Sequence, residues 1–414
     1  MKLYIFNMES RAAVYGIGTY VKELLSCLKD RNIQLTVVTI YAGNKEVEII
    51  HKTGYSQIYI PKVRNVNLRA EDVARRYSRN VVYILREFIP ADEPCIFHLN
   101  YMGDKYLACY LKEFFNCRIV LTVHYTNWSF DLLGNYEMLK SLLSKQISEM
   151  STPKEKNIIK NVENDREMIG WCDRIICIAR HSYDAICELY PEEKYKFALI
   201  NNGLEDVCGK NSLSEKTRLR RKYYISTQEK IILFAGRLDE VKGVTFLFNA
   251  FRKLLKEHDN IRLVVAGDGN LLKCFSDVNG FWTRVTFTGR LDKSQLFSFY
   301  KMADVGVVTS LHEEFGFVAV EMMMHALPLI VTDTTGLSEL VVDRVNGLKV
   351  SLRKVKGKPV VNTCLLSERI GYLLKNPFLA RKLGANARKY FLEKYERAVF
   401  ARHMIDFYEQ EVLD

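Results

Sequence analysis

A buried strand that passes into a helix through a glycine is the feature that most constrains how this sequence folds. Residues 304–310 (DVGVVTS) are apolar and largely β-branched, which is typical of a parallel strand covered on both faces. Residues 317–326 (FVAVEMMMHA) carry apolar side chains at helical spacing, and Gly316 stands between the two segments. Strand, glycine turn and helix in this order form the repeating unit of α/β domains with parallel sheets.

Two acidic residues flank this turn and make it a candidate binding site. Glu313 lies in the predicted loop, and Glu321 follows eight positions later in the predicted helix. The first N–H groups of a helix have no partner within it, so they attract phosphate. One carboxylate can then reach a sugar while the other reaches a ribose. The alternative is an ordinary loop with two solvated acids.

The same alternation of strands and helices continues along the whole chain. Strands are expected at residues 2–7, 35–40, 95–99, 118–124, 173–178, 230–235, 262–266, 284–287, 304–310 and 329–333. Helices are expected at residues 19–29, 129–168, 181–189, 244–257, 317–326 and from 336 onward. A further helix, capped by Asp292 or Ser294, is expected to end at Met302.

This pattern predicts an α/β fold with two Rossmann-like, doubly wound domains that face each other across a ligand-binding cleft. The turn signal Asn201-Asn202-Gly203 places the division between residues 1–200 and residues 201–394. The basic stretch 210–230 is expected to separate the two halves.

Composition and charge exclude some classes of protein and leave others open. The chain has 414 residues, which suits two domains, and it contains no apolar run long enough to span a membrane. Its N-terminal apolar segment is short and is interpreted as a first strand, not as a signal peptide. The ten cysteines are scattered, which favours reduced thiols in the cytoplasm. The net charge of +11 would attract a nucleotide diphosphate, a nucleic acid or an anionic membrane.

Residues 62–86 combine basic side chains with valines and tyrosines, and two interpretations of this stretch remain open. One is a helix that contacts the inner face of a membrane; the other is a packed helix with a solvated basic face. The basic residues are Lys62, Arg64, Arg69, Arg75, Arg76, Arg79 and Arg86.

Further candidate residues follow the predicted strands. Arg237 and Lys242 come just after the strand at 230–235, where both side chains could converge on one anionic group. The alternative is a surface pair next to Asp239 and Glu240. The glycine turns at 264–270 and at 287–290, which ends at Arg290, are weak signals by themselves, although the second could read a nucleobase edge.

Two histidines end predicted strands. His124 follows IVLTV and is a candidate for contacts with sugar hydroxyls or for proton transfer. His98 ends CIFH in the same manner, and for it a structural role is favoured. Gly16 and Gly18 are expected in a strand-to-helix loop, where glycine allows the backbone to approach a ligand closely. These two glycines are too sparse for the dinucleotide-binding fingerprint, so a nicotinamide cofactor is disfavoured.

The order of these segments resembles the retaining GT-B glycosyltransferases of family four, the glycosyl transferases group 1 family. The resemblance is strongest over residues 230–350, in FAGRLDEVKG, VVAGDG, FTG, ADVGVVTS, EEFGFVAVE, TGLSELV and NGLKV. It is thinner upstream, in YGIGTY, TVHYTN, CDRIICIA and NNGLE, where Tyr15 replaces the first glycine of the family's usual pair.

The resemblance implies a role for each matching residue. Arg237 and Lys242 would hold the donor diphosphate, and the amides of Gly316 and Phe317 would support it. Glu313 would contact the donor sugar, and Glu321 the ribose. His124 would approach the sugar and the acceptor. The remaining residues predicted to bind the donor are Gly16, Gly18, Gly236, Arg290 and Ser310. The family also implies a C-terminal helix, about 395–414 within the periodic stretch 388–411, that crosses back to the first domain.

The sequence therefore predicts a cytoplasmic, metal-independent glycosyltransferase of hexosyltransferase type. It would move a sugar from a UDP- or GDP-linked donor to an acceptor hydroxyl with retention, in bacterial glycan or glycoconjugate synthesis. No cofactor or metal is expected, because no Asp-x-Asp pair and no zinc-ligand spacing occur. No nucleic-acid partner is expected either. The acceptor stays open among a lipid-linked glycan, a glycan, a peptide and a small molecule. The alternatives are a nucleotide-sugar epimerase on the same fold and a sugar-nucleotide-binding subunit without turnover.

Overall fold

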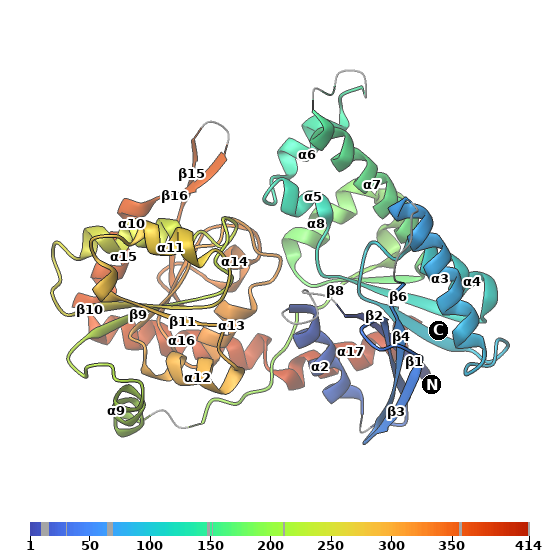
Figure 1. Cartoon of the computed structure of the whole chain (residues 1–414), viewed down its shortest axis with the longest axis horizontal. Coiled ribbons are helices and arrows are strands. Elements are labelled where there is room, and N and C mark those ends of the chain that lie inside the picture. Colours follow the sequence, from blue (N-terminus) through green and yellow to red (C-terminus); the bar gives the residue numbers. More distant parts are fainter. Residues whose placement is uncertain are drawn as a thin grey trace. The chain divides into compact units, whose positions relative to one another are not determined.

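The computed structural model divides into two compact units (Figure 1). Unit 1 comprises Met1–Gly203 and Arg397–Asp414, and unit 2 comprises Leu204–Glu396. Within unit 2 the two ends of the segment are neighbours, because the Leu204 amide donates to the Tyr395 carbonyl over 2.8 Å. The structure describes residues 1–9, 16–29, 31–63, 69–146, 150, 152–209, 212–355 and 358–412.

The described strands of unit 1 form one sheet in the order β3-β4-β2-β1-β5-β6-β7-β8. Neighbouring strands pair in parallel, except for the antiparallel hairpin of β3 and β4. The sequence did not predict this hairpin, because every residue of β3 is exposed and no apolar face marks it. The strands are β1 (Lys2–Met8), β2 (Gln34–Ala42), β3 (Glu48–Lys52), β4 (Tyr55–Pro61), β5 (Cys95–Leu99), β6 (Cys117–Val123), β7 (Arg174–Cys177) and β8 (Phe197–Leu199).

The helices of unit 1 pack apolar faces against this sheet and against one another, with α4 lying against both α3 and α7. They are α2 (Gly16–Leu28), α3 (Ala70–Arg86), α4 (Lys105–Phe114), α5 (Asn127–Asp131), α6 (Tyr136–Leu143), α7 (Pro153–Trp171), α8 (Arg180–Leu189), η2 (Pro191–Lys196), α17 (Arg397–Asp406) and η4 (Phe407–Val412). The prediction that Gly16 and Gly18 lie in a loop is wrong, because α2 begins at Gly16 and includes both. Tyr15 lies outside the described residues.

Helix α3 contains most of the basic stretch 62–86, of which residues 64–68 lie outside the described part. Its buried side chains are Tyr77, Ser78, Val81, Val82 and Leu85, whereas Arg75, Arg76, Arg79 and Arg86 are exposed. The helix is thus packed on one side and presents a solvated basic face on the other. Among the described helices, none combines the length and the apolar character needed to cross a membrane.

Unit 2 contains a parallel sheet in the order β11-β10-β9-β12-β13-β14 and a separate hairpin, β15–β16, which extends from the body of the unit in Figure 1. The strands are β9 (Lys230–Ala235), β10 (Ile261–Ala266), β11 (Val285–Gly289), β12 (Val305–Val308), β13 (Leu329–Thr332), β14 (Leu348–Val350), β15 (Leu352–Val355) and β16 (Lys358–Val361). The central strand β9 is fully buried after its first residue, as the apolar run of the sequence predicts.

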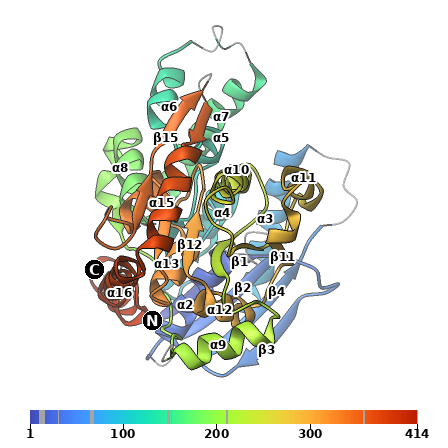
Figure 2. The same cartoon turned by 90° about the vertical axis from the view of Figure 1, so that its left-hand side faces the viewer.

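Helices cover this sheet, with α10 lying beside α15 in both views (Figures 1 and 2) and α13 packing against α16. The helical segments are α9 (Leu213–Lys222), α10 (Val244–Leu254), α11 (Leu271–Asp277), η3 (Trp282–Arg284), α12 (Lys293–Met302), α13 (Phe317–Met324), α14 (Thr335–Leu340), α15 (Thr363–Lys375) and α16 (Pro377–Lys394). Asp292 caps α12 through the Gln295 amide, and the Gln295 side chain returns the bond, so the cap is one of the two predicted.

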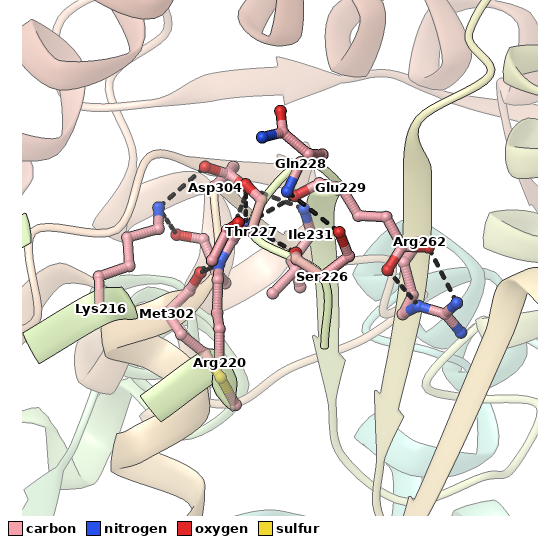
Figure 3. A network of polar contacts seen from close by, with 11 residues as sticks. Lys216, Arg220, Ser226, Thr227, Gln228, Glu229, Ile231, Arg262, Met302 and Asp304 are labelled. Atoms are coloured by element: carbon pink, nitrogen blue, oxygen red, sulfur yellow. Dashed lines mark hydrogen bonds and ion pairs between the residues drawn. The ribbon is translucent and has the colours of Figure 1, made fainter. Parts of the chain in front are cut away.

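The basic stretch 210–230 is not a linker in its described part, because α9 is tied to the amino edge of the sheet (Figure 3). Asp304, just before β12, accepts from Lys216 Nζ at 2.8 Å and from Arg220 Nη2 at 2.7 Å. It also accepts from the Ile231 amide of β9 at 2.7 Å. Burial raises the pKa of Asp304, but the two cations outweigh this effect and hold the pKa below its usual value.

The C-terminal region forms two helices where the sequence suggested one periodic stretch. Helix α16 ends at Lys394 and belongs to unit 2, whereas α17 begins at Arg397 and belongs to unit 1. Arg397 Nε pairs with Glu23 of α2 at 2.6 Å, and α17 packs along α2. The predicted return of the C-terminal helix to the first domain is confirmed.

Candidate functional site

In unit 2, Lys242, Ser310 and Glu313 meet at the carboxyl ends of β9 and β12. Glu313 Oε1 accepts from Lys242 Nζ at 2.6 Å and from Ser310 Oγ at 2.8 Å. The side chains of Lys242 and Glu313 keep 21% and 15% of their surface exposed, so the pair is shielded but reachable. The arrangement joins a cation, a hydroxyl and a carboxylate at the edge where parallel sheets bind ligands.

Contact between two loops fixes the position of Lys242. The Leu311 amide donates to the Val241 carbonyl over 2.7 Å, and Thr309 Oγ1 donates to the Lys242 carbonyl over 3.0 Å. Gly243 has a φ of 64°, and a Cβ there would come within 2.2 Å of the Thr309 carbonyl oxygen. Only glycine allows this approach, so the loop after β9 is locked against the loop after β12.

Arg237 lies in the same loop but has a different partner. Its Nε is 2.8 Å from Asp239 Oδ2, and its side chain is 31% exposed. The preceding residue, Gly236, has a φ of 151° and lies against Gly267, where a Cβ would come within 1.8 Å of the Gly236 carbonyl oxygen. The structure thus places Arg237 in the local pair with Asp239 that the sequence left open as an alternative. It does not bring Arg237 and Lys242 onto one acidic partner.

The glycine turn identified in the sequence forms as predicted. Gly316 is the N-terminal cap of α13, with a left-handed φ of 98°, and Phe317 is the first residue of the helix. The start of α14 holds the preceding loop, because the Glu313 amide donates to Thr335 Oγ1 over 3.0 Å. The Gly336 amide donates to the Glu313 carbonyl over 2.9 Å. The first turn of α13 and the Lys242–Glu313 pair are therefore parts of one loop cluster.

Glu321 is more deeply buried than the sequence suggested, with 2% of its side chain exposed. Tyr300 of α12 donates to its Oε2 over 2.8 Å, and Lys293 Nζ pairs with its Oε1. Burial and the neighbouring Glu321 raise the pKa of Tyr300. Sequence reasoning missed Lys293 and Tyr300. The one signal was the predicted helix that ends at Met302, and nothing in its sequence indicates a contact with Glu321. Arg290, another predicted donor residue, is exposed just after β11.

In unit 1, His124 lies directly after β6 in a buried polar cluster. Its Nε2 is 2.9 Å from Asn100 Oδ1, and its ring packs edge-to-face on Tyr20 of α2 at 4.7 Å between centroids. Its side chain is 8% exposed, and burial lowers its pKa to about 3, so the imidazole is neutral at physiological pH. Gly16 and Gly18 open α2 one turn before Tyr20.

His98 belongs to a chain of buried hydrogen bonds, as the structural interpretation predicted. Its Nε2 is 2.7 Å from Thr122 Oγ1, which is 2.9 Å from the Tyr20 hydroxyl. Its Nδ1 bonds to the hydroxyl of Tyr408 in the C-terminal segment. Burial and, to a smaller extent, the neighbouring His124 lower the pKa of His98 to about 3.

Within the described ranges, no group of three or more His, Cys, Asp or Glu side chains could hold a metal ion. The charged groups of the loop cluster in unit 2 are the ion pair of Lys242 with Glu313.

Two family models match the chain, and together they cover most of it. The model described as Glycosyl transferases group 1 matches residues 215–390. The model described as Glycosyltransferase Family 4 matches residues 14–206.

Individual proteins give the same picture. An uncharacterized glycosyltransferase of Methanocaldococcus jannaschii, MJ1607, is 31% identical over 243 residues, which are 57% of this chain and 60% of that protein. The chain thus spans less than two thirds of this relative. Sucrose-phosphate synthase from Thermosynechococcus elongatus matches with a TM-score of 0.75 and 19% identity, covering 99% of this chain and 98% of that one. Anabaena HepE in complex with UDP and glucose matches with a TM-score of 0.74 and 15% identity, covering 99% and 100%.

Proposed function

Because the chain belongs to the glycosyl transferases group 1 family of GT-B glycosyltransferases, we propose that it transfers a sugar from a nucleotide-diphosphate donor to an acceptor hydroxyl with retention of configuration. The observation that carries the proposal is the cluster of Lys242, Ser310 and Glu313 beside the start of α13. Such a cluster combines groups that bind phosphate with a carboxylate that can bind sugar hydroxyls.

In the proposed reaction, the bond between the anomeric carbon and the diphosphate oxygen breaks, and negative charge develops on the departing diphosphate. Lys242 and the first amides of α13, those after Gly316, stabilise this charge. Arg237, partly exposed in the same loop, adds a second cation when it leaves Asp239 for the phosphate. Glu313 holds Lys242 in place before the donor binds and then accepts hydrogen bonds from the donor sugar.

The remaining roles are proposed from the family resemblance. The leaving phosphate takes the acceptor proton on the same face, since burial lowers the pKa of His124 to about 3 and makes it a poor base. His124 instead contacts the sugar or the acceptor as a hydrogen-bonding group. Glu321 binds the ribose after Lys293 moves aside. We also propose that the reaction needs no metal, because cations and amides supply the positive charge.

The donor and the setting are proposals as well. A UDP- or GDP-linked sugar is the proposed donor, and the UDP and glucose bound to the related HepE fold support the first choice. We propose a cytoplasmic role in bacterial glycan or glycoconjugate synthesis, and none of the ten cysteines, all within the described residues, forms a disulfide. The exposed arginines of α3 are the proposed contact with the inner face of the membrane.

Substitution of Lys242 tests the proposal most directly. We expect Lys242→Ala to lower the transfer rate about 10²–10³-fold, the usual loss when one preorganised charge donor is removed. Nucleotide release from UDP-glucose, UDP-N-acetylglucosamine and GDP-mannose measures the rate. Lys256→Ala, which removes an exposed cation just beyond α10, is the matched control and should keep full activity. A Lys242→Ala variant with wild-type turnover would contradict the assigned role.

The same assay separates the alternatives when it is run with and without acceptor glycans. A glycosyltransferase releases nucleotide faster when the acceptor is present. Equal release in both conditions would indicate an epimerase or hydrolase. Donor binding without release under either condition, measured by thermal shift, would indicate a binding subunit without turnover.

A further inference from the structure

Unit 1 contains a cavity that the proposed donor cluster does not include. The cavity has a volume of about 270 Å³ and lies among α3, α4, the start of α5 and α7. Helix α4 lies against both α3 and α7 (Figure 1). The volume is close to the lower end of ordinary small-ligand sites, about 300–1,000 Å³.

Asp165 of α7 lines this cavity and lacks a partner. Its side chain is 2% exposed, and no hydrogen-bond donor among the described residues reaches its Oδ2. A buried carboxylate without a partner is strongly unfavourable. Burial accordingly raises the pKa of Asp165 to about 7. A ligand that donates a hydrogen bond to this carboxyl group would reduce this penalty.

The lysines of the cavity are already neutralised by acids. Lys105, with 13% of its side chain exposed, donates to Asn164 Oδ1 at 2.7 Å and pairs with Glu167 at 2.8 Å. Lys160 pairs with Glu71 at 3.4 Å. Because these cations are compensated and Asp165 is not, the cavity does not favour an anionic ligand. Among the described residues no metal cluster exists either.

The other lining groups favour a ligand with many hydroxyls. Amide side chains of Asn161 and Asn164 can each donate and accept, as paired sugar hydroxyls require. Tyr106 also lines the cavity; its hydroxyl donates to Glu71 over 2.6 Å, and Arg75 and Lys105 lie over its ring.

We propose that this cavity binds a neutral polyhydroxylated compound, a sugar or polyol, whose hydroxyls donate hydrogen bonds to Asp165. The inference deepens the proposed function, on which its second half rests: the bound compound is the acceptor, or the part of a larger acceptor that unit 1 recognises. It selects a glycan or polyol from the acceptor classes that the sequence left open.

The test measures binding of glucose, N-acetylglucosamine and myo-inositol to the full chain by saturation-transfer NMR, with inorganic phosphate as the negative probe. We expect at least one of the three compounds to bind, and we expect that added nucleotide does not displace it. Asp165→Asn keeps the size of the side chain but removes the charged acceptor, so it should weaken that binding about tenfold or more. Glu163→Gln removes an exposed charge from the same helix and should change nothing.

A second variant guards against a folding defect in Asp165→Asn. Ala74→Leu narrows the cavity from α3 without touching Asp165, and it should weaken the same binding. Failure of all three probes to bind at millimolar concentration, or full binding by both variants, would overturn the inference.

Binding of UDP and GDP in the same samples distinguishes this inference from the proposed function. If sugar binding depends on Asp165 but no nucleotide binds, the proposed transfer is refuted and the sugar site in the cavity is supported. If nucleotide binds and transfer occurs while Asp165→Asn binds sugars as tightly as the wild type, the proposed transfer is supported and the sugar site is refuted.

Discussion

Asp104 and Asp165 are carboxyl groups that unit 1 buries, with 9% and 2% of their side chains exposed. Burial raises the pKa of each to about 7. In the unfolded chain an aspartate has a pKa near 3.9, so folding takes up protons between about pH 4 and pH 7. The native state is therefore favoured on the acid side of this window and loses stability as the pH rises through it.

Replacing Asp104 with asparagine tests this linkage. We expect the stability of Asp104→Asn relative to the wild type to increase by about 2–3 kcal/mol from pH 5 to pH 8, because the wild type loses stability as the buried carboxyl ionises and the variant does not. Tyr41, Tyr77 and Tyr125 interact with Asp104, and their raised pKa values keep them neutral throughout. Melting temperatures of both proteins from pH 5 to pH 8 measure the effect. Parallel curves for the two proteins would contradict it.

Sequence reasoning identified single residues of the site better than their partners. Lys242 and Glu313 stood out because each lies beside a strand end, yet their contact spans 71 positions and depends on two loops touching. Lys293 was missed because its contact with Glu321 depends on α12 lying beside α13. Residue type and spacing indicate which groups can bind a ligand, whereas the pairing of those groups is a tertiary property.

Among the elements, α9 shows that a basic segment can be structural. Lys216 and Arg220 use their charges on Asp304 and on backbone carbonyls at the amino edge of the sheet (Figure 3). Part of the chain's net positive charge therefore stabilises the fold and is not available to a ligand. Helix α2 shows that glycines alone do not identify a loop. Gly16 and Gly18 suggested one, but they form the first turn of this helix.

Loss of Arg220 should destabilise unit 2. The side chain is 5% exposed and bonds to Asp304 and to the Met302 and Glu229 carbonyls. Arg220→Ala leaves Asp304 with less compensation, and we expect a loss of about 3 kcal/mol in unfolding free energy. Urea titration monitored by circular dichroism measures the loss. Arg221→Ala, an exposed neighbour in α9, is the control, and equal effects of the two substitutions would refute the assignment.

At the scale of the whole molecule, the C-terminal segment completes unit 1. Arg397 pairs with Glu23, and the hydroxyl of Tyr408 bonds to His98 under β5 and β6. The alternation of strands and helices allowed both doubly wound sheets to be predicted. It did not predict the break between α16 and α17, because the helical periodicity continues across residues 395 and 396.

Removal of one hydroxyl from the C-terminal segment should weaken the distant N-terminal half. Tyr408→Phe removes the hydroxyl that bonds to the buried His98 Nδ1. We expect this loss to lower the unfolding free energy by about 1–3 kcal/mol. We expect faster hydrogen exchange in peptides of β5 and β6 and unchanged exchange in unit 2. Tyr372→Phe, at a half-exposed tyrosine of α15, should leave both unchanged. Faster hydrogen exchange in unit 2 alone would contradict this prediction.

The hydrogen bond between Leu204 and Tyr395 joins the two ends of a long inserted segment. The residues between them form one compact inserted domain, whose first and last residues are neighbours. If residues 204–396 were deleted, a linker of a few glycines would be long enough to connect residue 203 to residue 397. Each half of the protein could in this way be purified and studied alone, although only one of them is continuous in the gene.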